Sequence, residues 1–167
     1  MRRLLKPEKK ILTPDELNRR LAGWRFKQQK VVFTNGCFDL LHAGHVEYLR
    51  QAAQEGDVLI VGLNSDASVS RLKGEGRPLQ SQQARALTLA ALSFVDAVVI
   101  FDEDTPYDLI KTVQPYALVK GSDYRIEDIV GHDLVLARGG VVFTIPLVMG
   151  FSTTALINKI CKLNRNG

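Results

Sequence analysis

The sequence predicts a single α/β domain with an open, doubly wound sheet of about five parallel strands and helices on both faces. Short and nearly continuous apolar runs alternate with segments of helical spacing from residue 31 onward. Such runs are typical of strands that are buried on both faces of a parallel sheet. A length of 167 residues and a hydrophobic content of 46% suit one globular domain. Together these observations indicate a Rossmann-like architecture.

The expected elements follow one another in a regular order. A helix should begin near Thr13 and Pro14, because threonine is a favoured N-cap residue and proline suits the first helical turn. The apolar runs that predict strands are Val31–Thr34, Val58–Leu63, Ala97–Phe101, Ala117–Val119 and Val141–Ile145. Helices are expected at about residues 43–54, 66–72, 81–94, 106–113, 126–138 and 153–163.

Charge and cysteine content restrict the classes of partner. Residues 1–10 contain five basic residues and one acidic residue, so they carry the whole formal net charge of +4. A basic tail on a neutral domain is typical of a solvated terminus, and we expect no nucleic-acid partner. Neither a membrane-spanning apolar run nor a secretory signal is recognisable. Cys37 and Cys161 lie far apart in the sequence, as expected of reduced thiols in a cytoplasmic protein.

The densest group of polar and glycine residues follows the first expected strand. Open α/β sheets bind ligands beyond the carboxyl ends of their strands, near the point where the strand order reverses. The segment at this position, residues 34–45, reads TNGCFDLLHAGH. A GxxxxGK[ST] sequence is absent, and no GxGxxG follows the first strand, which excludes the two common phosphate fingerprints. The glycines at 74 and 76 follow a helix instead and indicate a mobile loop.

His42 and His45 are the residues in this segment with the clearest chemistry. Their spacing of three places both on one side of a first helical turn, beside free backbone N–H groups and the positive end of the helix dipole. This arrangement suits a phosphate, although capping or core packing explains the same spacing. Zinc is disfavoured because a third ligand is missing, and we predict no metal-ligating residues.

Residues 42–45 resemble the HxGH motif of the nucleotidyltransferase superfamily, which includes cytidylyltransferases and class I aminoacyl-tRNA synthetases. Four further segments occur in the order that the resemblance requires: residues 62–66, 71–78, 119–124 and 150–154. All five together resemble the bacterial heptose-1-phosphate adenylyltransferases of the lipopolysaccharide-core sugar pathway. The match covers residues 30–161, so residues 1–29 are interpreted as a basic extension with a helix and residues 30–163 as a stand-alone nucleotidyltransferase domain.

The resemblance implies roles for individual residues. The implied catalytic groups are His42, His45, Lys73 and Arg85, with the lysine and arginine on the triphosphate. Taken without the resemblance, Lys73 is a solvated charge, Arg85 a surface arginine, and Asp39 and Ser152 helix caps. The implied substrate residues are Asp39, Asn64 and Asp66, of which Asp39 would organise substrate or metal. The implied nucleotide-binding residues are Asn35, Gly36, Cys37, Phe38, Lys120, Gly121, Asp123, Gly150, Ser152, Thr153 and Thr154.

The implied reaction transfers AMP from ATP, with Mg²⁺ bound to it, to a heptose 1-phosphate, giving ADP-heptose and pyrophosphate. A phosphate monoester has a second pKa of about 6, so it attacks as a dianion without a general base. Catalysis then consists of positioning and charge stabilisation. The family also implies a homodimer or higher homo-oligomer.

Three other functions compete with this one. A CTP-dependent cytidylyltransferase acting on a small alcohol phosphate, such as glycerol 3-phosphate, shares most of the motifs. A non-catalytic nucleotide-binding module would not need the intact histidine pair. An RNA-binding synthetase fragment lacks the interleaved aromatic and basic residues that single-stranded RNA requires.

Overall fold

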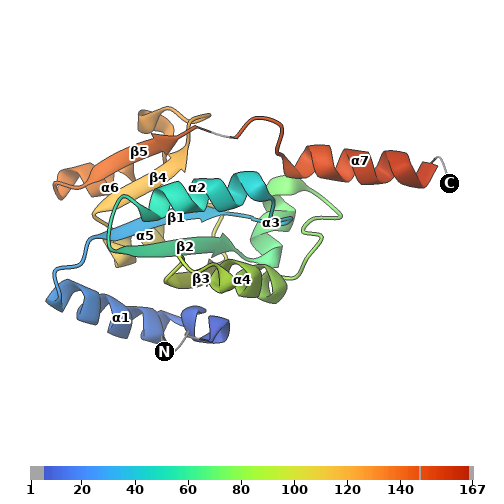
Figure 1. Cartoon of the computed structure of the whole chain (residues 1–167). Helices are drawn as coiled ribbons and strands as arrows, with labels where there is room; N and C mark the ends of the chain where they lie inside the picture. The colour runs from blue at the N-terminus through green and yellow to red at the C-terminus, as the bar shows by residue number, and fades with distance from the viewer. Residues whose placement is uncertain (1–5, 147, 166–167) are drawn as a thin grey trace.

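The computed structural model describes residues 6–146 and 148–165 and contains one five-stranded sheet (Figure 1). All paired strands are parallel, in the order β3-β2-β1-β4-β5. The predicted fold class is therefore confirmed. Each expected strand is present: β1 spans Val31–Gly36, β2 Val58–Asn64, β3 Ala97–Phe101, β4 Ala117–Gly121 and β5 Val141–Ile145.

The order of the strands creates a topological switch point at the centre of the sheet. From β1 the chain proceeds outward through β2 to β3, and it then crosses to the other side of β1 to form β4. The β1–β4 pair aligns Val32 with Ala117, so the carboxyl ends of these two strands open at the same edge. Ligand crevices in such sheets occur at this position.

Helices cover both faces of the sheet (Figure 1). One hydrophobic cluster joins the sheet to α2 and α4 through residues such as Leu49 and Leu89, and the other joins it to α1, α5 and α6 through Leu21, Ile110 and Val135. The helices are α1 Pro14–Phe26, α2 Ala43–Ala53, α3 Asp66–Lys73, α4 Gln82–Ala91, α5 Tyr107–Val113, α6 His132–Ala137 and α7 Thr153–Arg165, with 3-10 turns at Pro7–Lys10 and Ile126–Asp128.

Two helix predictions were wrong in extent. The single helix expected at 126–138 is a 3-10 turn followed by the separate helix α6. Gly131 separates them because its φ of 83° is left-handed, and a Cβ there would lie 2.8 Å from Cδ1 of Ile110. The helix expected at 81–94 ends at Ala91, where the extended Leu92 leads into the turn before β3.

The segment before β1 packs closely against the rest of the domain. Thr13 caps α1 in a capping box with Glu16, as the sequence predicts. The backbone N–H of Leu12 donates to the carbonyl of Val98 at 2.9 Å, and Leu17 and Leu21 are buried. The first five residues of the predicted basic tail lie outside the described residues.

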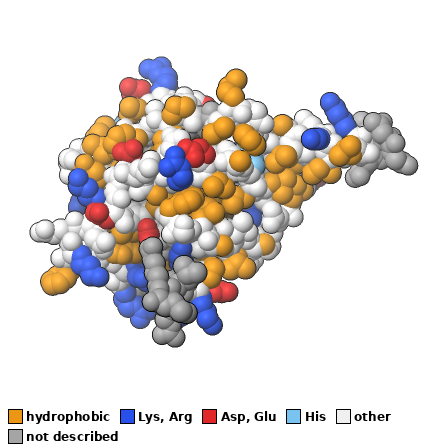
Figure 2. Space-filling view, viewed as in Figure 1, with side chains coloured by type: hydrophobic (Ala, Val, Ile, Leu, Met, Phe, Trp, Pro, Cys, Tyr) orange, Lys and Arg blue, Asp and Glu red, His pale blue; other side chains and the backbone are white. Residues whose placement is uncertain are grey.

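Helix α7 leads away from the body of the molecule (Figure 1). Hydrophobic side chains lie along it in Figure 2, and Leu156, Ile160 and Leu163 are exposed. Among the described residues no helix is both long enough and apolar enough to cross a membrane.

Candidate active site

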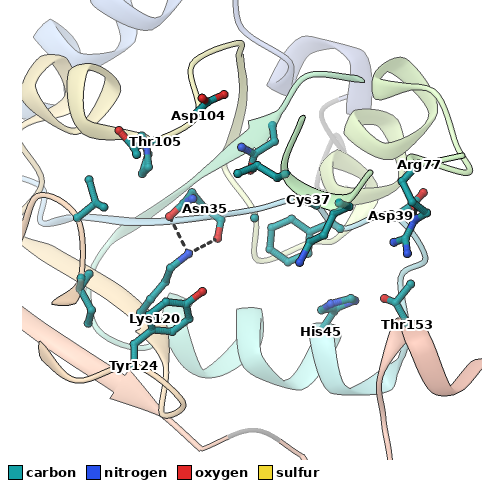
Figure 3. Close-up of a pocket in the computed structure, with 18 of the residues that line it drawn as sticks. Asn35, Cys37, Asp39, His45, Arg77, Asp104, Thr105, Lys120, Tyr124 and Thr153 are labelled. Carbon is teal, nitrogen blue, oxygen red and sulfur yellow. Dashed lines mark hydrogen bonds and ion pairs between the residues drawn. The ribbon is translucent and has the colours of Figure 1, made fainter. Parts of the chain in front are cut away.

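Two adjoining cavities open at the carboxyl ends of β1, β2 and β4 (Figure 3). The larger has a volume of about 490 Å³ and extends toward the loop after β3, whereas the smaller has a volume of about 410 Å³ and extends over the start of α2. Both lie at the switch point of the sheet. The residues that line both cavities are Asn35, Gly36, Cys37, Phe38, His45, Lys73, Lys120, Tyr124 and Thr153.

The loop from β1 to α2 forms the wall shared by the two cavities. Gly36 is required there, because a Cβ would lie 2.9 Å from the Phe38 ring. The Phe38 backbone is left-handed, with a φ of 44°, and its ring lies edge-on to that of His45 at 5.2 Å between centroids. Phe38 therefore positions His45 from the side of the sheet.

The two histidines stack on each other at the N-terminus of α2. Their ring centroids lie 3.7 Å apart, and Nδ1 of His42 accepts a hydrogen bond from the His45 backbone N–H at 3.3 Å. His42 is thus the N-cap of α2. A Cβ at Gly44 would lie 3.1 Å from the His42 ring, so the glycine between the histidines permits this stacking. The capping interpretation and the phosphate-receptor interpretation are compatible, since a helix N-terminus provides both.

Neither imidazole is charged at neutral pH. Burial, together with the neighbouring His42, lowers the pKa of His45 to about 4. Burial also lowers the pKa of His42. The pair therefore offers neutral N–H groups to a ligand, and positive charge at the site comes from lysine, arginine and the helix N-termini.

Lys120 connects β4 to β1 across the switch point. Its Nζ donates to the backbone carbonyl of Asn35 at 3.1 Å and to Oδ1 of Asn35 at 3.0 Å (Figure 3). The ammonium also lies 5.4 Å from the centre of the Tyr124 ring. Burial lowers the pKa of Lys120. Gly121 and Asp123, which follow it, line the smaller cavity beside the histidines.

The N-terminus of α7 closes the cavities on the side of α2. Oγ of Ser152 accepts from the Ala155 backbone N–H at 3.0 Å, and Thr153 and Thr154 line the larger cavity. Gly150 lines neither cavity; its φ of 85° allows the chain to turn into the helix. These threonines and the first-turn amides bring a second helix N-terminus to the cavities, and helix N-termini can bind anions.

Lys73 and Asn64 both reach the cavities. Lys73 ends α3 and lines both cavities, and Asn64 ends β2 and lines the larger one. Burial raises the pKa of the Cys37 thiol, although nearby cations, Lys73 foremost, partly offset the effect.

The structure places Arg85 differently from both sequence-based interpretations. Its side chain is 1% exposed, and it lines neither cavity. Its guanidinium donates to the carbonyls of Cys37 at 2.6 Å, Asn64 at 2.9 Å and Gln80 at 3.1 Å, and to Oδ1 of Asp66 at 2.7 Å. Arg85 therefore holds the backbone segments that form the cavity walls, and Asp66 is one of its partners. Asp66 itself lines neither cavity.

The Asp39 carboxylate is also occupied by hydrogen bonds from other residues of the protein. It is 2% exposed and accepts hydrogen bonds from the backbone N–H groups of Leu79 and Gln80 and from Nε of Arg77. Burial alone would raise its pKa, but these donors hold the pKa below its usual value. Because His42 caps α2, Asp39 is not the helix cap that the alternative interpretation expected.

Several lining residues were missed in the sequence. Asp104 and Thr105 follow β3, and their position just after an apolar run was a signal that the strand-end rule could have used. Arg77 reaches the larger cavity from the loop between α3 and α4, within the segment 71–78, although no role was assigned to it, and Asp128 reaches it from the 3-10 turn at Ile126–Asp128.

Comparison with known proteins identifies the family. The family described as cytidylyltransferase-like matches residues 33–159. The chain belongs to this family. The cytidylyltransferase-like chain is 57% identical over 152 residues to the bifunctional protein HldE of Nitrobacter hamburgensis and 58% identical over 156 residues to that of Rhodopseudomonas palustris strain HaA2. The alignments cover 91% and 93% of this chain but 31% and 32% of the relatives. It thus spans about a third of their length.

Two solved structures resemble the fold of the cytidylyltransferase-like chain. A lipopolysaccharide core biosynthesis protein from Thermoplasma volcanium superimposes with a TM-score of 0.59 and 25% identity, covering 72% of this chain and 97% of its own. A pantoate–β-alanine ligase from Francisella tularensis gives a TM-score of 0.56 at 16% identity, covering 81% of this chain and 66% of its own, and shows the fold alone.

Removing Arg85 should destabilise the protein more than it affects the ligand site directly. Arg85→Met leaves four buried or half-buried acceptors without their donor, and we expect a loss of about 3–5 kcal/mol in the free energy of unfolding, measured in urea. Arg19→Met, at an exposed position on α1, is the matched control and should stay within about 0.5 kcal/mol of wild type. A stable Arg85→Met protein that has lost affinity for ATP would instead place Arg85 on the triphosphate.

Acid should destabilise the fold through His45. Its pKa is about 4 in the folded protein and 6.5 in an ordinary environment. Between these values the unfolded chain binds a proton that the folded protein does not bind, so the free energy of unfolding falls as the pH decreases from 6.5 toward 4. His45→Gln should show a shallower decrease over this range in parallel urea titrations. Identical pH profiles for the two proteins would contradict the neutral, buried imidazole.

Proposed function

We propose that the chain is a nucleotidyltransferase that transfers AMP from ATP to a heptose 1-phosphate, giving ADP-heptose and pyrophosphate. The observation that carries the proposal is the convergence of two helix N-termini, the stacked histidine pair, Lys73 and Lys120 on one pair of cavities. Membership of the cytidylyltransferase-like family supports nucleotidyl transfer. The identity to HldE proteins and the name of the Thermoplasma neighbour support a role in lipopolysaccharide core biosynthesis.

The two cavities accommodate the two substrates. The smaller is lined by His42, Gly121, Asp123 and Ser152, and we assign the nucleoside to it. The larger reaches Asn64, Asp104 and Thr105 at the ends of β2 and β3, whose polar side chains suit the hydroxyl groups of a sugar. The residues shared by both cavities then surround the α-phosphorus.

The chemistry follows from the charges that the site must stabilise. An oxygen of the sugar phosphate, already a dianion, attacks the α-phosphorus, and the bond from this phosphorus to the oxygen that bridges the α- and β-phosphates breaks, so that this oxygen leaves with the pyrophosphate. Negative charge develops on the leaving pyrophosphate. We assign its stabilisation to the N–H groups of His42 and His45, the Lys73 ammonium and the N-terminus of α7, which line the cavities and need not reorganise.

Mg²⁺ enters this proposal as part of the ATP substrate. No group of three or more His, Cys, Asp or Glu residues suited to a metal ion occurs in residues 6–146 and 148–165. The oxygens of the triphosphate would therefore supply most of the ligands. The bound ion would neutralise part of the charge on the phosphates.

From its composition and charge distribution we infer a cytoplasmic protein with no nucleic-acid partner. The resemblance implies in addition a homodimer or a higher homo-oligomer. The exposed apolar side chains of Leu156, Ile160 and Leu163 on α7 support self-association.

A nucleotide and acceptor panel tests the proposed reaction. ATP with heptose 1-phosphate should release pyrophosphate far faster than CTP with the same acceptor or with glycerol 3-phosphate, because the five motifs resemble the adenylyltransferases. Release is measured with a coupled pyrophosphate assay. Equal or faster turnover with CTP and glycerol 3-phosphate would assign the chain to the cytidylyltransferases of small alcohol phosphates.

His45→Ala separates transition-state stabilisation from binding. Loss of one preorganised donor costs about 10²–10³ in rate, so turnover should fall at least roughly a hundredfold, while ATP affinity stays within about tenfold of wild type. His42→Ala should behave similarly and should also lose about 1 kcal/mol of stability with the N-cap, which His42→Asn would restore. Single-turnover rates and thermal melts provide the two readouts. Normal turnover by both folded alanine variants would contradict the mechanism.

A further inference from the structure

Arg77 is a cation at the rim of the larger cavity that the proposed reaction has not used. Its Nε donates to Oδ2 of Asp39 at 2.7 Å, and its side chain is 21% exposed, compared with 1% for Asp39. Within residues 6–146 and 148–165 the Arg77 side chain donates only through Nε, and no hydrogen bond engages its two Nη groups. The guanidinium is therefore fixed at Nε, and the two Nη nitrogens, with four N–H donors, remain for a ligand.

Asp39 fixes the backbone around Arg77 as well as its side chain. The backbone N–H groups of Leu79 and Gln80 donate to the carboxylate at 2.8 Å and 3.0 Å, and Nε2 of Gln80 donates to the Asp39 carbonyl at 2.8 Å. The loop between α3 and α4 is thereby attached to the β1–α2 loop, which leads into the histidine pair. Gly74, with a φ of 92°, lies between Lys73 and this attachment and allows the chain to turn there.

The position of Arg77 indicates which part of the two substrates its side chain can reach. It lines the larger cavity together with Lys73, Thr153 and Thr154, and it does not line the smaller cavity. In Figure 3 Arg77 lies on the same side of the view as Thr153, whereas Asp104 and Thr105 lie on the other side. In this view Arg77 therefore lies on the α7 side of the larger cavity, away from the proposed sugar end.

We propose that Arg77 binds the β- and γ-phosphates of the nucleotide, with Asp39 as the positioning residue that orients its guanidinium. A planar guanidinium with two adjacent N–H donors matches the oxygens of a phosphate, and a carboxylate on Nε removes much of its rotational freedom. This inference rests on the proposed function only in taking a nucleoside triphosphate as a substrate.

Calorimetry on the full chain, with Mg²⁺ and without acceptor, tests the proposal with ATP, pyrophosphate and AMP as ligands. Hydrogen bonds to charged groups contribute about 1.5–3 kcal/mol, so Arg77→Ala should weaken ATP and pyrophosphate binding roughly 10- to 100-fold. AMP affinity should change less than about twofold, since AMP lacks the two terminal phosphates. Arg77→Lys, which keeps the charge but loses the planar pair of donors, should lie between. The matched control, Arg19→Ala on the exposed surface of α1, should bind all three ligands normally.

A double-mutant cycle tests the role of Asp39. Asp39→Asn keeps an acceptor for the loop amides but loses the charged pair, and it should weaken pyrophosphate binding in the same direction as Arg77→Ala. If Asp39 acts through Arg77, the double variant should bind pyrophosphate no more weakly than Arg77→Ala alone. Fully additive losses would overturn the positioning role. If Asp39→Asn does not fold, as judged by thermal melts, the Arg77→Ala and Arg77→Lys affinities decide the proposal alone.

The outcomes also separate this inference from the proposed function. Wild-type affinity of Arg77→Ala for pyrophosphate would overturn the inference, and so would an equal loss for AMP or a rise confined to KM for heptose 1-phosphate. If wild type binds ATP but does not turn over heptose 1-phosphate, the proposed acceptor is wrong. The comparison of pyrophosphate with AMP remains decisive for Arg77 in that case.

Discussion

The buried guanidinium of Arg85 is the interaction on which the geometry of the site depends. It joins the ends of β1 and β2, the start of α3 and the loop before α4 through Cys37, Asn64, Asp66 and Gln80. A buried cation is tolerated only when its donors are satisfied, so these four segments must keep their relative positions. The β1–α2 loop, which leads into the histidine pair at the start of α2, and the loop containing Arg77 are consequently held in fixed relative positions.

Anion recognition in these cavities depends on oriented N–H groups as much as on net charge. The pKa values of both histidines are lowered, so their imidazoles are neutral donors at the N-terminus of α2. The N-terminus of α7 faces the same cavity from another direction. Preorganised dipoles of this kind stabilise a developing charge without having to reorient, which suits transfer between two phosphorylated substrates.

The sequence predicts the parts of this protein that depend on local patterns. Continuous apolar runs placed all five strands, the strand-end rule led to the histidine pair, and the family resemblance led to Lys120 and the N-terminus of α7. The directions of the Arg85 and Asp39 side chains were not predictable, because most of their partners are distant in the sequence. Apart from Gln80, the partners of Arg85 lie 19 to 48 residues away. The partners of the Asp39 carboxylate lie 38 to 41 residues away. A buried arginine and a solvated one have the same sequence pattern on a short helix. The break at Gly131 was missed for a similar reason, since Ile110 on another helix requires the glycine.

Amide hydrogen exchange with and without Mg²⁺ and ATP tests the location of the phosphate site most directly. If the phosphates bind at the two helix N-termini, ATP should slow exchange at the first-turn amides of α2 and α7, around His45 and Ala155, and in the loop of residues 77–80. The groove between α5 and α6 should exchange at the same rate in both states and serves as the internal control. Protection confined to that groove, or unchanged exchange at both helix N-termini under saturating ATP, would contradict the account.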